Sequence, residues 1–192
     1  MPLIRGHYSV TNPTWLGNGS PSGMFRENLP LGRLMLASNL SALTTQVMTS
    51  TWLPLETGDI VTSLTFLSGG TAAGTPTNWW FALYDTQATP ALIAQTADQL
   101  TAAWAANTAK TLALSAPYLV PKAGVYQASI MMKATTPVTL AGLTLENAAA
   151  AGAIVSGQLP LAQTSGSSLT TTAPGTIATP TTVATIPYVI AT

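Results

Sequence analysis

Alternating apolar and polar positions recur in short runs from Gln46 onward, and turn residues separate the runs. One face of the run 60–67 is predicted to carry Ile60, Thr62, Leu64 and Phe66. One face of the run 125–133 is predicted to carry Tyr126, Ala128, Ile130 and Met132. Further strands are expected at 47–53, 91–96, 110–115 and 138–145. Short strands separated by turns predict an all-β fold, a β-sandwich or jelly roll, rather than alternating strands and helices.

The stretch NWWFALYD, residues 78–85, breaks this alternation because it is apolar on both faces. A strand loses its alternation when both of its faces are buried. We therefore expect a central strand with the core on one face and an arm, a helix or a neighbouring subunit on the other. Trp79 and Trp80 point to opposite faces of a strand, so one sugar ring cannot stack on both. Core packing is their favoured role, and exposure of either ring would indicate a carbohydrate or partner platform.

Only one stretch, ADQLTAAWAANTA at 97–109, has helix propensity, and its Thr and Asn residues weaken it. There we expect at most a short helix, or a loop anchored by Trp104. The interior of the body should instead come from strand residues. For this core we predict Leu64, Phe66, Trp80, Phe81, Leu83, Leu112, Leu114, Tyr126 and Ile130.

The N-terminal residues 1–37 show no sustained period and are interrupted by many Pro and Gly residues. Bulky apolar side chains nonetheless recur in this segment, which a solvated linker would not normally carry. We interpret residues 1–37 as an extended arm that lies against its own domain or a neighbouring chain. For contacts between chains we select Tyr8, Trp15, Met24 and Phe25 in this arm, together with Trp79 and Tyr188 elsewhere.

The C-terminal residues 148–192 differ from the body at 38–147, because they are rich in Ala, Thr, Ser, Gly and Pro and almost free of charge. Such a low-complexity tail is often disordered. It ends, however, in the strand-like run 186–190. We therefore expect a C-terminal strand that is added to the sandwich or to a neighbouring copy.

Charge is scarce in the whole chain. Six basic and six acidic side chains, 6% of 192 residues, cancel to a formal net charge of zero, while 47% of residues are hydrophobic. Because binding to nucleic acid or to anionic membranes needs clustered Lys and Arg, we expect neither partner. Net charge near zero favours association, which is a weak indication of an assembled state. There is no cysteine, and we expect neither a cleaved signal peptide nor a membrane-spanning helix.

No pattern in the sequence specifies a catalytic, cofactor or metal site. The single histidine, His7, lacks a triad partner and enough nearby carboxylates for zinc. Asp59, Asp85 and Asp98 follow or occupy turns, where aspartate commonly bonds the backbone, although a catalytic carboxylate pair needs only proximity in space. The glycines of SGGTAAGT match neither a phosphate loop nor a dinucleotide fingerprint, and no calcium loop or G-x-S-x-G motif is present. We expect a non-enzymatic protein without cofactors.

Two stretches carry a resemblance to a known class: GDIVTSLTFLSGGTAAGTPTNWWFALYD and ALIAQTADQLTAAWAANTAKTLALSAPYLVPKAGVYQASIMM. They resemble virion proteins of tailed bacteriophages, particularly those of actinobacterial hosts. In such proteins a W-F-A-L-Y-D type strand precedes T-A-D-Q-T-like and A-W-A-A-N-T-like segments, an alternating T-L-A-L strand and a G-x-Y strand. The likeness covers residues 56–145 and contains no catalytic motif.

The resemblance implies a β-sandwich that oligomerises on the particle surface, as a head-decoration, minor tail or tail-fibre component. The arm and tail suit a decoration protein that binds the major capsid protein and neighbouring copies; three-fold symmetry is a guess from the class. No collagen-like or heptad repeat typical of tail rods is present, so head decoration is favoured. A minor tail role in host adsorption, with a cell-surface glycan as partner, stays open, as does a carbohydrate-binding module.

Overall fold

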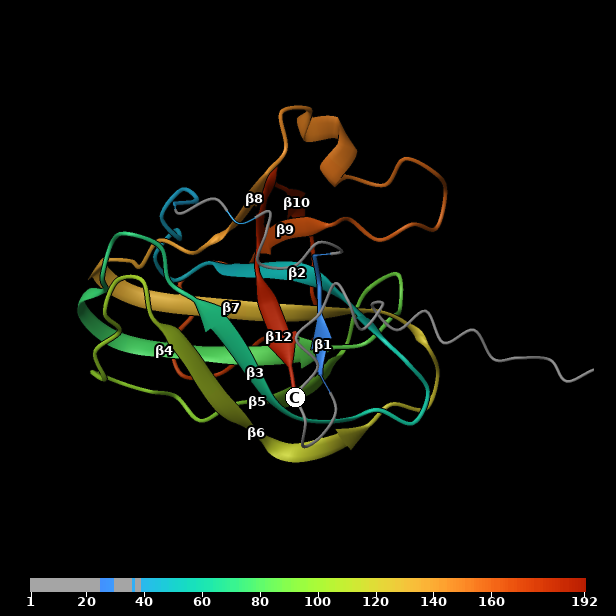
Figure 1. The fold of residues 1–192 in the computed structure, drawn as a ribbon, viewed down its shortest axis with the longest axis horizontal. Helices are drawn as coiled ribbons and strands as arrows, with labels where there is room; N and C mark the ends of the chain where they lie inside the picture. The colour runs from blue at the N-terminus through green and yellow to red at the C-terminus, as the bar shows by residue number, and fades with distance from the viewer. Residues whose placement is uncertain (1–24, 30–35, 37–38) are drawn as a thin grey trace, which may run out of the picture.

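The chain forms an all-β sandwich, which confirms the predicted fold class, and the computed structural model describes residues 25–29, 36 and 39–192 (Figure 1). Two antiparallel sheets make up most of it. The larger contains β2 (Met48–Leu55), β4 (Gly74–Tyr84), β5 (Leu92–Gln95), β7 (Gly124–Thr136), β9 (Ala162–Ser165) and β10 (Thr181–Thr182). Its spatial order is β10-β9-β2-β7-β4-β5.

The smaller sheet combines both ends of the described chain. It contains β1 (Arg26–Glu27), β3 (Ile60–Leu67), β6 (Ala109–Leu119) and β12 (Val189–Ala191), in the order β1-β12-β3-β6. β8 (Gly142–Thr144) and β11 (Thr185–Pro187) form a separate antiparallel pair, and a 3-10 turn, η2, spans Ala148–Ala151. Figure 1 shows β1 in blue beside β12 in red, at the front of the sandwich.

The main hydrophobic core fills the space between the two sheets. Among the predicted core residues it contains Leu64, Phe66, Phe81, Leu83, Leu114, Tyr126 and Ile130, while Leu112 is partly buried against it. On β7 the predicted alternation is also confirmed, since Tyr126, Ala128, Ile130 and Met132 all face this core. Trp80 is fully buried as well, but it belongs to a second cluster on the opposite face of the large sheet.

β4 is buried on both faces, as its lost alternation predicts. Trp79, Phe81 and Leu83 point into the main core, and the residues between them point outward. The outward side chains Trp80, Ala82 and Tyr84 are covered by Ala173 and Ile177. The C-terminal segment of the same chain thus covers this face of the sheet. Its apolar side chains pack on a face that would otherwise be exposed to solvent.

The stretch 97–109 contains no α-helix and runs as a loop until β6 begins. A loop is one of the two alternatives predicted for this stretch. Trp104 anchors the loop: it is 1% exposed and its indole N–H donates to the carbonyl of Thr108 at 3.0 Å. The expected strand at 138–145 is reduced to β8, with an isolated bridge between Ser68 and Leu140 before it.

The predicted face of β3 is wrong at its start. Ile60 and Thr62 are exposed and Val61 is fully buried, whereas Leu64 and Phe66 face the core as expected. The pairing with β6 shifts between Val61 and Ser63. There the partner on β6 changes from Tyr118 to Ala113 while β3 advances only from Val61 to Ser63. The ladder is irregular at this point, so a strict period of two fails across it.

The proposed division into arm, body and tail does not coincide with separate structural units. β9 of the tail pairs with β2, and β12 of the tail pairs with β3. From the arm, β1 pairs with β12. Residues 25–29 and the tail are therefore integral parts of the sandwich. Within the described residues, no helix is long and apolar enough to cross a membrane.

Candidate functional site

Both adjacent tryptophans of β4 are inside the protein, with no exposed surface. Trp79 stacks on Trp104 at a ring separation of 5.2 Å, and its indole N–H donates to the carbonyl of Ala102 at 2.9 Å. The indole N–H of Trp80 donates to the carbonyl of Thr170 at 2.8 Å. Core packing is confirmed for both rings. The expectation of Trp79 at an interface is corrected, because neither ring offers a surface to a sugar or to another chain.

Tyr188 is also an internal side chain rather than an interface residue. It is 3% exposed, and its hydroxyl donates to the carboxylate of Glu27 in β1. Tyr188 lies between β11 and β12, which both pair within the chain's own sheets, and its ring is not exposed to a partner. Phe25 is half-buried at the start of the first described segment. The remaining interface candidates, Tyr8, Trp15 and Met24, lie outside the described residues.

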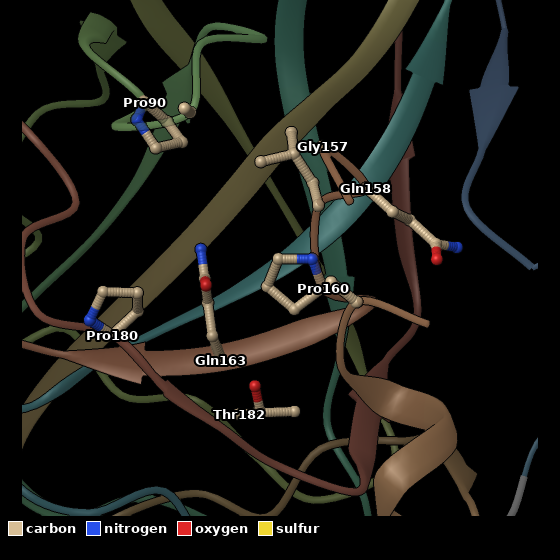
Figure 2. Close-up of a pocket in the computed structure, with 10 residues that line it drawn as sticks. Pro90, Gly157, Gln158, Pro160, Gln163, Pro180 and Thr182 are labelled. Atoms are coloured by element: carbon tan, nitrogen blue, oxygen red, sulfur yellow. The ribbon is translucent and has the colours of Figure 1, made fainter. Parts of the chain in front are cut away.

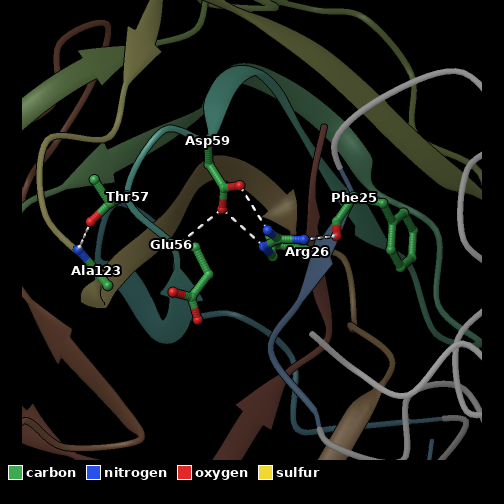
Figure 3. A network of polar contacts seen from close by, with 6 residues as sticks. All are labelled: Phe25, Arg26, Glu56, Thr57, Asp59 and Ala123. Atoms are coloured by element: carbon green, nitrogen blue, oxygen red, sulfur yellow. Dashed lines mark hydrogen bonds and ion pairs between the residues drawn. The ribbon is translucent and has the colours of Figure 1, made fainter. Parts of the chain in front are cut away.

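An ion pair fixes β1 to the turn between β2 and β3 (Figure 3). The Arg26 guanidinium donates from Nε and Nη2 to the two carboxylate oxygens of Asp59, at 2.9 and 2.8 Å. One of these oxygens also accepts from the backbone N–H of Glu56 at 2.9 Å. This two-pronged geometry is the strong form of an arginine–carboxylate contact. It confirms the turn role predicted for Asp59 and adds an attachment to the N-terminal segment.

Asn28 attaches the same segment to three strands, β2, β11 and β12. Its side chain is 1% exposed, and its amide nitrogen donates to the hydroxyl of Thr51 at 3.0 Å and to the carbonyl of Pro187 at 2.7 Å. Its amide oxygen accepts from the backbone N–H of Val189 at 3.0 Å. Asn28 thus bonds to both the large sheet and the C-terminal strands. The point at which the N-terminal segment enters the sandwich is firmly held.

Two other aspartates also serve the backbone. Asp85 accepts from the N–H of Ala91 at 2.9 Å, and Asp98 accepts from the N–H of Trp79 at 2.9 Å. The predicted turn roles are confirmed by local bonds, since Asp85 accepts from the N–H of Gln87 at 3.1 Å and Asp98 accepts from the N–H of Leu100 at 3.2 Å. Within the part of the chain that the structure describes, no group of three or more His, Cys, Asp and Glu residues is placed to hold a metal ion.

Tyr84 is the buried phenol beneath the tail. Its hydroxyl donates to the carbonyl of Pro174 at 2.8 Å, and burial raises its pKa far above the ordinary value for tyrosine. Burial disfavours the charged phenolate, so this group stays protonated across the physiological range. It acts as a fixed hydrogen-bond donor that fastens the tail to the outer face of the large sheet.

Two neighbouring pockets lie on the outer face of the large sheet and share the loop 157–159. The first, about 280 Å³, has walls formed by Pro90, Pro160 and Pro180 (Figure 2). The second, about 350 Å³, is lined by Trp52, Thr86, Val125, Leu161 and the shared loop. All of the described residues that line the two pockets are uncharged.

Two polar atoms beneath these pockets are buried without a hydrogen-bond partner among the described residues, and a third polar group reaches into the first pocket. The Gln163 side chain, on a residue only 2% exposed, carries its amide into the first pocket between Pro160 and Pro180, as Figure 2 shows. The indole nitrogen of Trp52 and the amide oxygen of Gln127 are buried and unpaired. An unsatisfied buried polar group costs about 1–3 kcal/mol, so such groups indicate a missing partner.

No sequence pattern distinguishes Trp52 or Gln163 as a candidate site residue. Trp52 lies in an expected strand at an alternating position, and Gln163 lies in a tail that composition alone describes poorly. The two residues become neighbours of one site only because β9 of the tail is added beside β2. That pairing joins residues far apart in sequence. No short-range sequence pattern indicates the pairing of β9 with β2.

Comparison with known proteins provides no identification. The chain matches no protein-family model and no curated protein.

Proposed function

We propose that this protein is a non-enzymatic structural protein on the surface of a tailed-bacteriophage virion, where it decorates the head. The observation that carries the proposal is the anchorage of β1 at the edge of the small sheet. Residues 1–24 precede this strand and contain the bulky side chains Tyr8, Trp15 and Met24. A segment that grips another surface holds its domain there only when its base is fixed. The Arg26–Asp59 pair and Asn28 provide such a base.

The structure also narrows which segment would bind the particle. Most of the tail pairs with strands of its own chain or covers Trp80, although Ile154 and Val155 are exposed. We assign contact with the major capsid protein and with neighbouring copies, a trimer in the simplest case, to residues 1–24, which carry more bulky apolar side chains than this exposed pair. The sequence resemblance of residues 56–145 to virion proteins of tailed phages supports a place on the virion but does not distinguish the head from the tail.

A minor tail protein that adsorbs to a host glycan is the second candidate. The observation that favours it is the pair of uncharged pockets on the outer face of the large sheet. Uncharged linings with isolated amide and hydroxyl groups suit a neutral ligand better than an anionic one.

Binding to particles depleted of the protein tests the proposal. Full-length protein should co-sediment with such particles, and a variant lacking residues 1–24 should remain folded and stay in the supernatant. A variant with Gln163→Ala serves as the control, because its residues 1–24 are intact. Equal binding by the truncated variant would show that the arm is not the attachment segment. Failure of the full-length protein to bind any part of the particle would reject the virion assignment.

A further inference from the structure

We propose that the paired pockets at the loop 157–159 form a binding site for a neutral saccharide. The head-decoration role does not use this site. The glycan-adsorption candidate draws on the same pockets, and the present inference deepens it by naming the ligand class and the residues that would contact it; it does not require that the protein is carried on a particle. The argument rests on the chemistry of the linings, on the unpaired polar groups and on the one partly exposed tryptophan ring among the described residues.

The linings exclude charged ligands. The first pocket is formed by Ala88, Pro90, Ala153, Gly157, Gln158, Leu159, Pro160, Gln163, Pro180 and Thr182. The second adds Trp52, Thr86, Val125 and Leu161. None of these side chains can neutralise a phosphate, a carboxylate or an ammonium group, and burying an unpaired charge is strongly unfavourable. A neutral ligand is the one that the site can accept.

The polar groups in the site suit hydroxyls. The side-chain amide of Gln163, which lies between Pro160 and Pro180, carries both a donor and an acceptor at the first pocket. Thr182 adds a hydroxyl on the same side, and Thr86 adds one to the second pocket. A group that both donates and accepts pairs best with another that does both, and hydroxyl groups of a sugar have this property.

Beneath the loop, one unpaired donor and one unpaired acceptor face each other across two strands. Trp52 of β2 stands directly opposite Gln127 of β7, and the two side chains share the outer face of the sheet. The indole nitrogen lacks an acceptor and the amide oxygen lacks a donor. A hydroxyl group can both accept and donate, so it is the kind of partner that this pair of atoms lacks. The amide nitrogen of Gln127 is already held by the carbonyl of Pro160 at 3.3 Å, which keeps the oxygen in this region.

Trp52 also supplies the apolar surface that a sugar ring needs. Trp79, Trp80 and Trp104 are all buried in the interior, whereas Trp52 is half-buried and lines the second pocket. Leu159 lines both pockets, and proline rings wall the first. Aromatic and aliphatic walls with a few placed polar groups are typical of small-molecule sites. The C–H face of a pyranose fits against such walls while its hydroxyls meet the amide groups.

The indole N–H signals in a ¹H–¹⁵N spectrum provide the test, with glucose, galactose, mannose, arabinose and N-acetylglucosamine as probes. The Trp52 signal, assigned from a Trp52→Phe variant, should shift saturably with at least one sugar. The signals of Trp79, Trp80 and Trp104 should stay in place, because each donates to a fixed backbone carbonyl. Gln163→Ala should weaken the titration at least tenfold, and Gln99→Ala, which alters a glutamine remote from both pockets, should leave it unchanged.

A parallel readout keeps the test decisive if a variant is unstable. Saturation-transfer NMR on the full-length protein detects the sugar protons directly, and thermal unfolding of each variant checks its fold. Absence of any sugar signal and of any Trp52 shift in the folded full-length protein would overturn the proposal. So would a Trp52 shift that folded Gln163→Ala retains at full strength.

Discussion

At the scale of single residues, Asp59 performs two tasks with one carboxylate. It closes the turn before β3 through the N–H of Glu56, and it holds Arg26 of β1 in a two-pronged ion pair. Asp59 is 8% exposed while the Arg26 side chain is 24% exposed. The pair is thus partly shielded from water. An ion pair in such a position stabilises the fold more than one on an open surface.

Arg26→Ala should lower the free energy of unfolding by about 1–2 kcal/mol, because it removes charge-assisted hydrogen bonds and leaves a nearly buried carboxylate without its partner. Arg26→Lys should give a smaller loss, since lysine keeps the charge but not the planar fork. Urea denaturation measures both. Identical stability of the alanine variant and the natural protein would show that the pair does not hold β1.

Tyr84 makes the free energy of unfolding depend on pH in the alkaline range. Its pKa in the folded protein lies above the value of 10.0 for an unperturbed tyrosine, because burial disfavours the phenolate. The neutral side chain therefore stabilises the fold fully below pH 10, and this contribution is lost as the pH rises above 10, where the unfolded chain ionises first.

Tyr84→Phe should reduce the loss of stability above that pH and should cost about 1 kcal/mol at neutral pH, because the hydrogen bond to Pro174 disappears. Thermal melts across neutral and alkaline buffers measure the two effects. The account of Tyr84 fails if the variant and the natural protein lose stability in parallel at high pH.

At the scale of elements, the closest approach between backbones occurs where β8 meets β11. Gly142 pairs with Pro187, and a Cβ atom added at Gly142 would lie 2.1 Å from the carbonyl oxygen of Ile186. The colliding atom belongs to the backbone and cannot rotate away. This pair of strands brings the tail back toward the small sheet, so its geometry matters for the whole C-terminal segment.

Gly142→Ala should destabilise the protein by about 1–3 kcal/mol or more, because overpacking against backbone forces the two strands apart. Gly175→Ala is the matched control, since an added Cβ there meets nothing within 4 Å. Differential scanning calorimetry of the two variants compares them directly. Equal melting temperatures would contradict the tight pairing of β8 with β11.

The strands of the body could be predicted from the sequence because their alternation is local. The period of two located β3 and β7, and the missing alternation of residues 78–85 identified a strand covered on both sides. The irregular pairing after Val61 could not be predicted, since it depends on the pairing with β6 and on bonds from Thr62 and Ser63 to the carbonyl of Thr192. Pairings between residues far apart in the sequence do not change the pattern of apolar and polar residues around them, so the sequence alone does not predict them.

The candidate site could be predicted even less. Its members come from β2, β7 and β9 and from loops at 86–90 and 157–160. The high density of aromatic residues at 78–85 favoured Trp79 as a candidate, although the ring available to a ligand is that of Trp52. Burial decides between these rings, and burial depends on where the tail lies. Only the assembled sheet shows that the tail covers Trp80 and leaves Trp52 beside a pocket.

At the scale of the whole molecule, the two ends of the described chain pair with each other. β1 is paired with β12, and Glu27 and Asn28 bond to Tyr188 and Val189. The base of the N-terminal segment and the C-terminal strands are therefore one structural unit. Residues 25–29 thus belong to the folded body, although the sequence pattern places them in the segment 1–37.

Two truncations test whether residues 25–29 belong to the folded body. Deletion of residues 1–24 should leave the melting temperature nearly unchanged, because every contact of Arg26, Glu27 and Asn28 described above is retained. Deletion of residues 1–29 should lower the melting temperature by several degrees, since it removes the ion pair, leaves the edge of β12 open and takes away the side chain that bonds to Thr51 and Pro187. Similar melting temperatures for both truncations would contradict this assignment of residues 25–29.

Cryo-electron microscopy of intact particles tests the central claim most directly. The account predicts many copies of the sandwich on the outer surface of the head, with density that continues from Phe25 into the capsid lattice or a neighbouring copy. Density for the protein at the tail alone, or none on the particle, would contradict the assignment as a head-decoration protein.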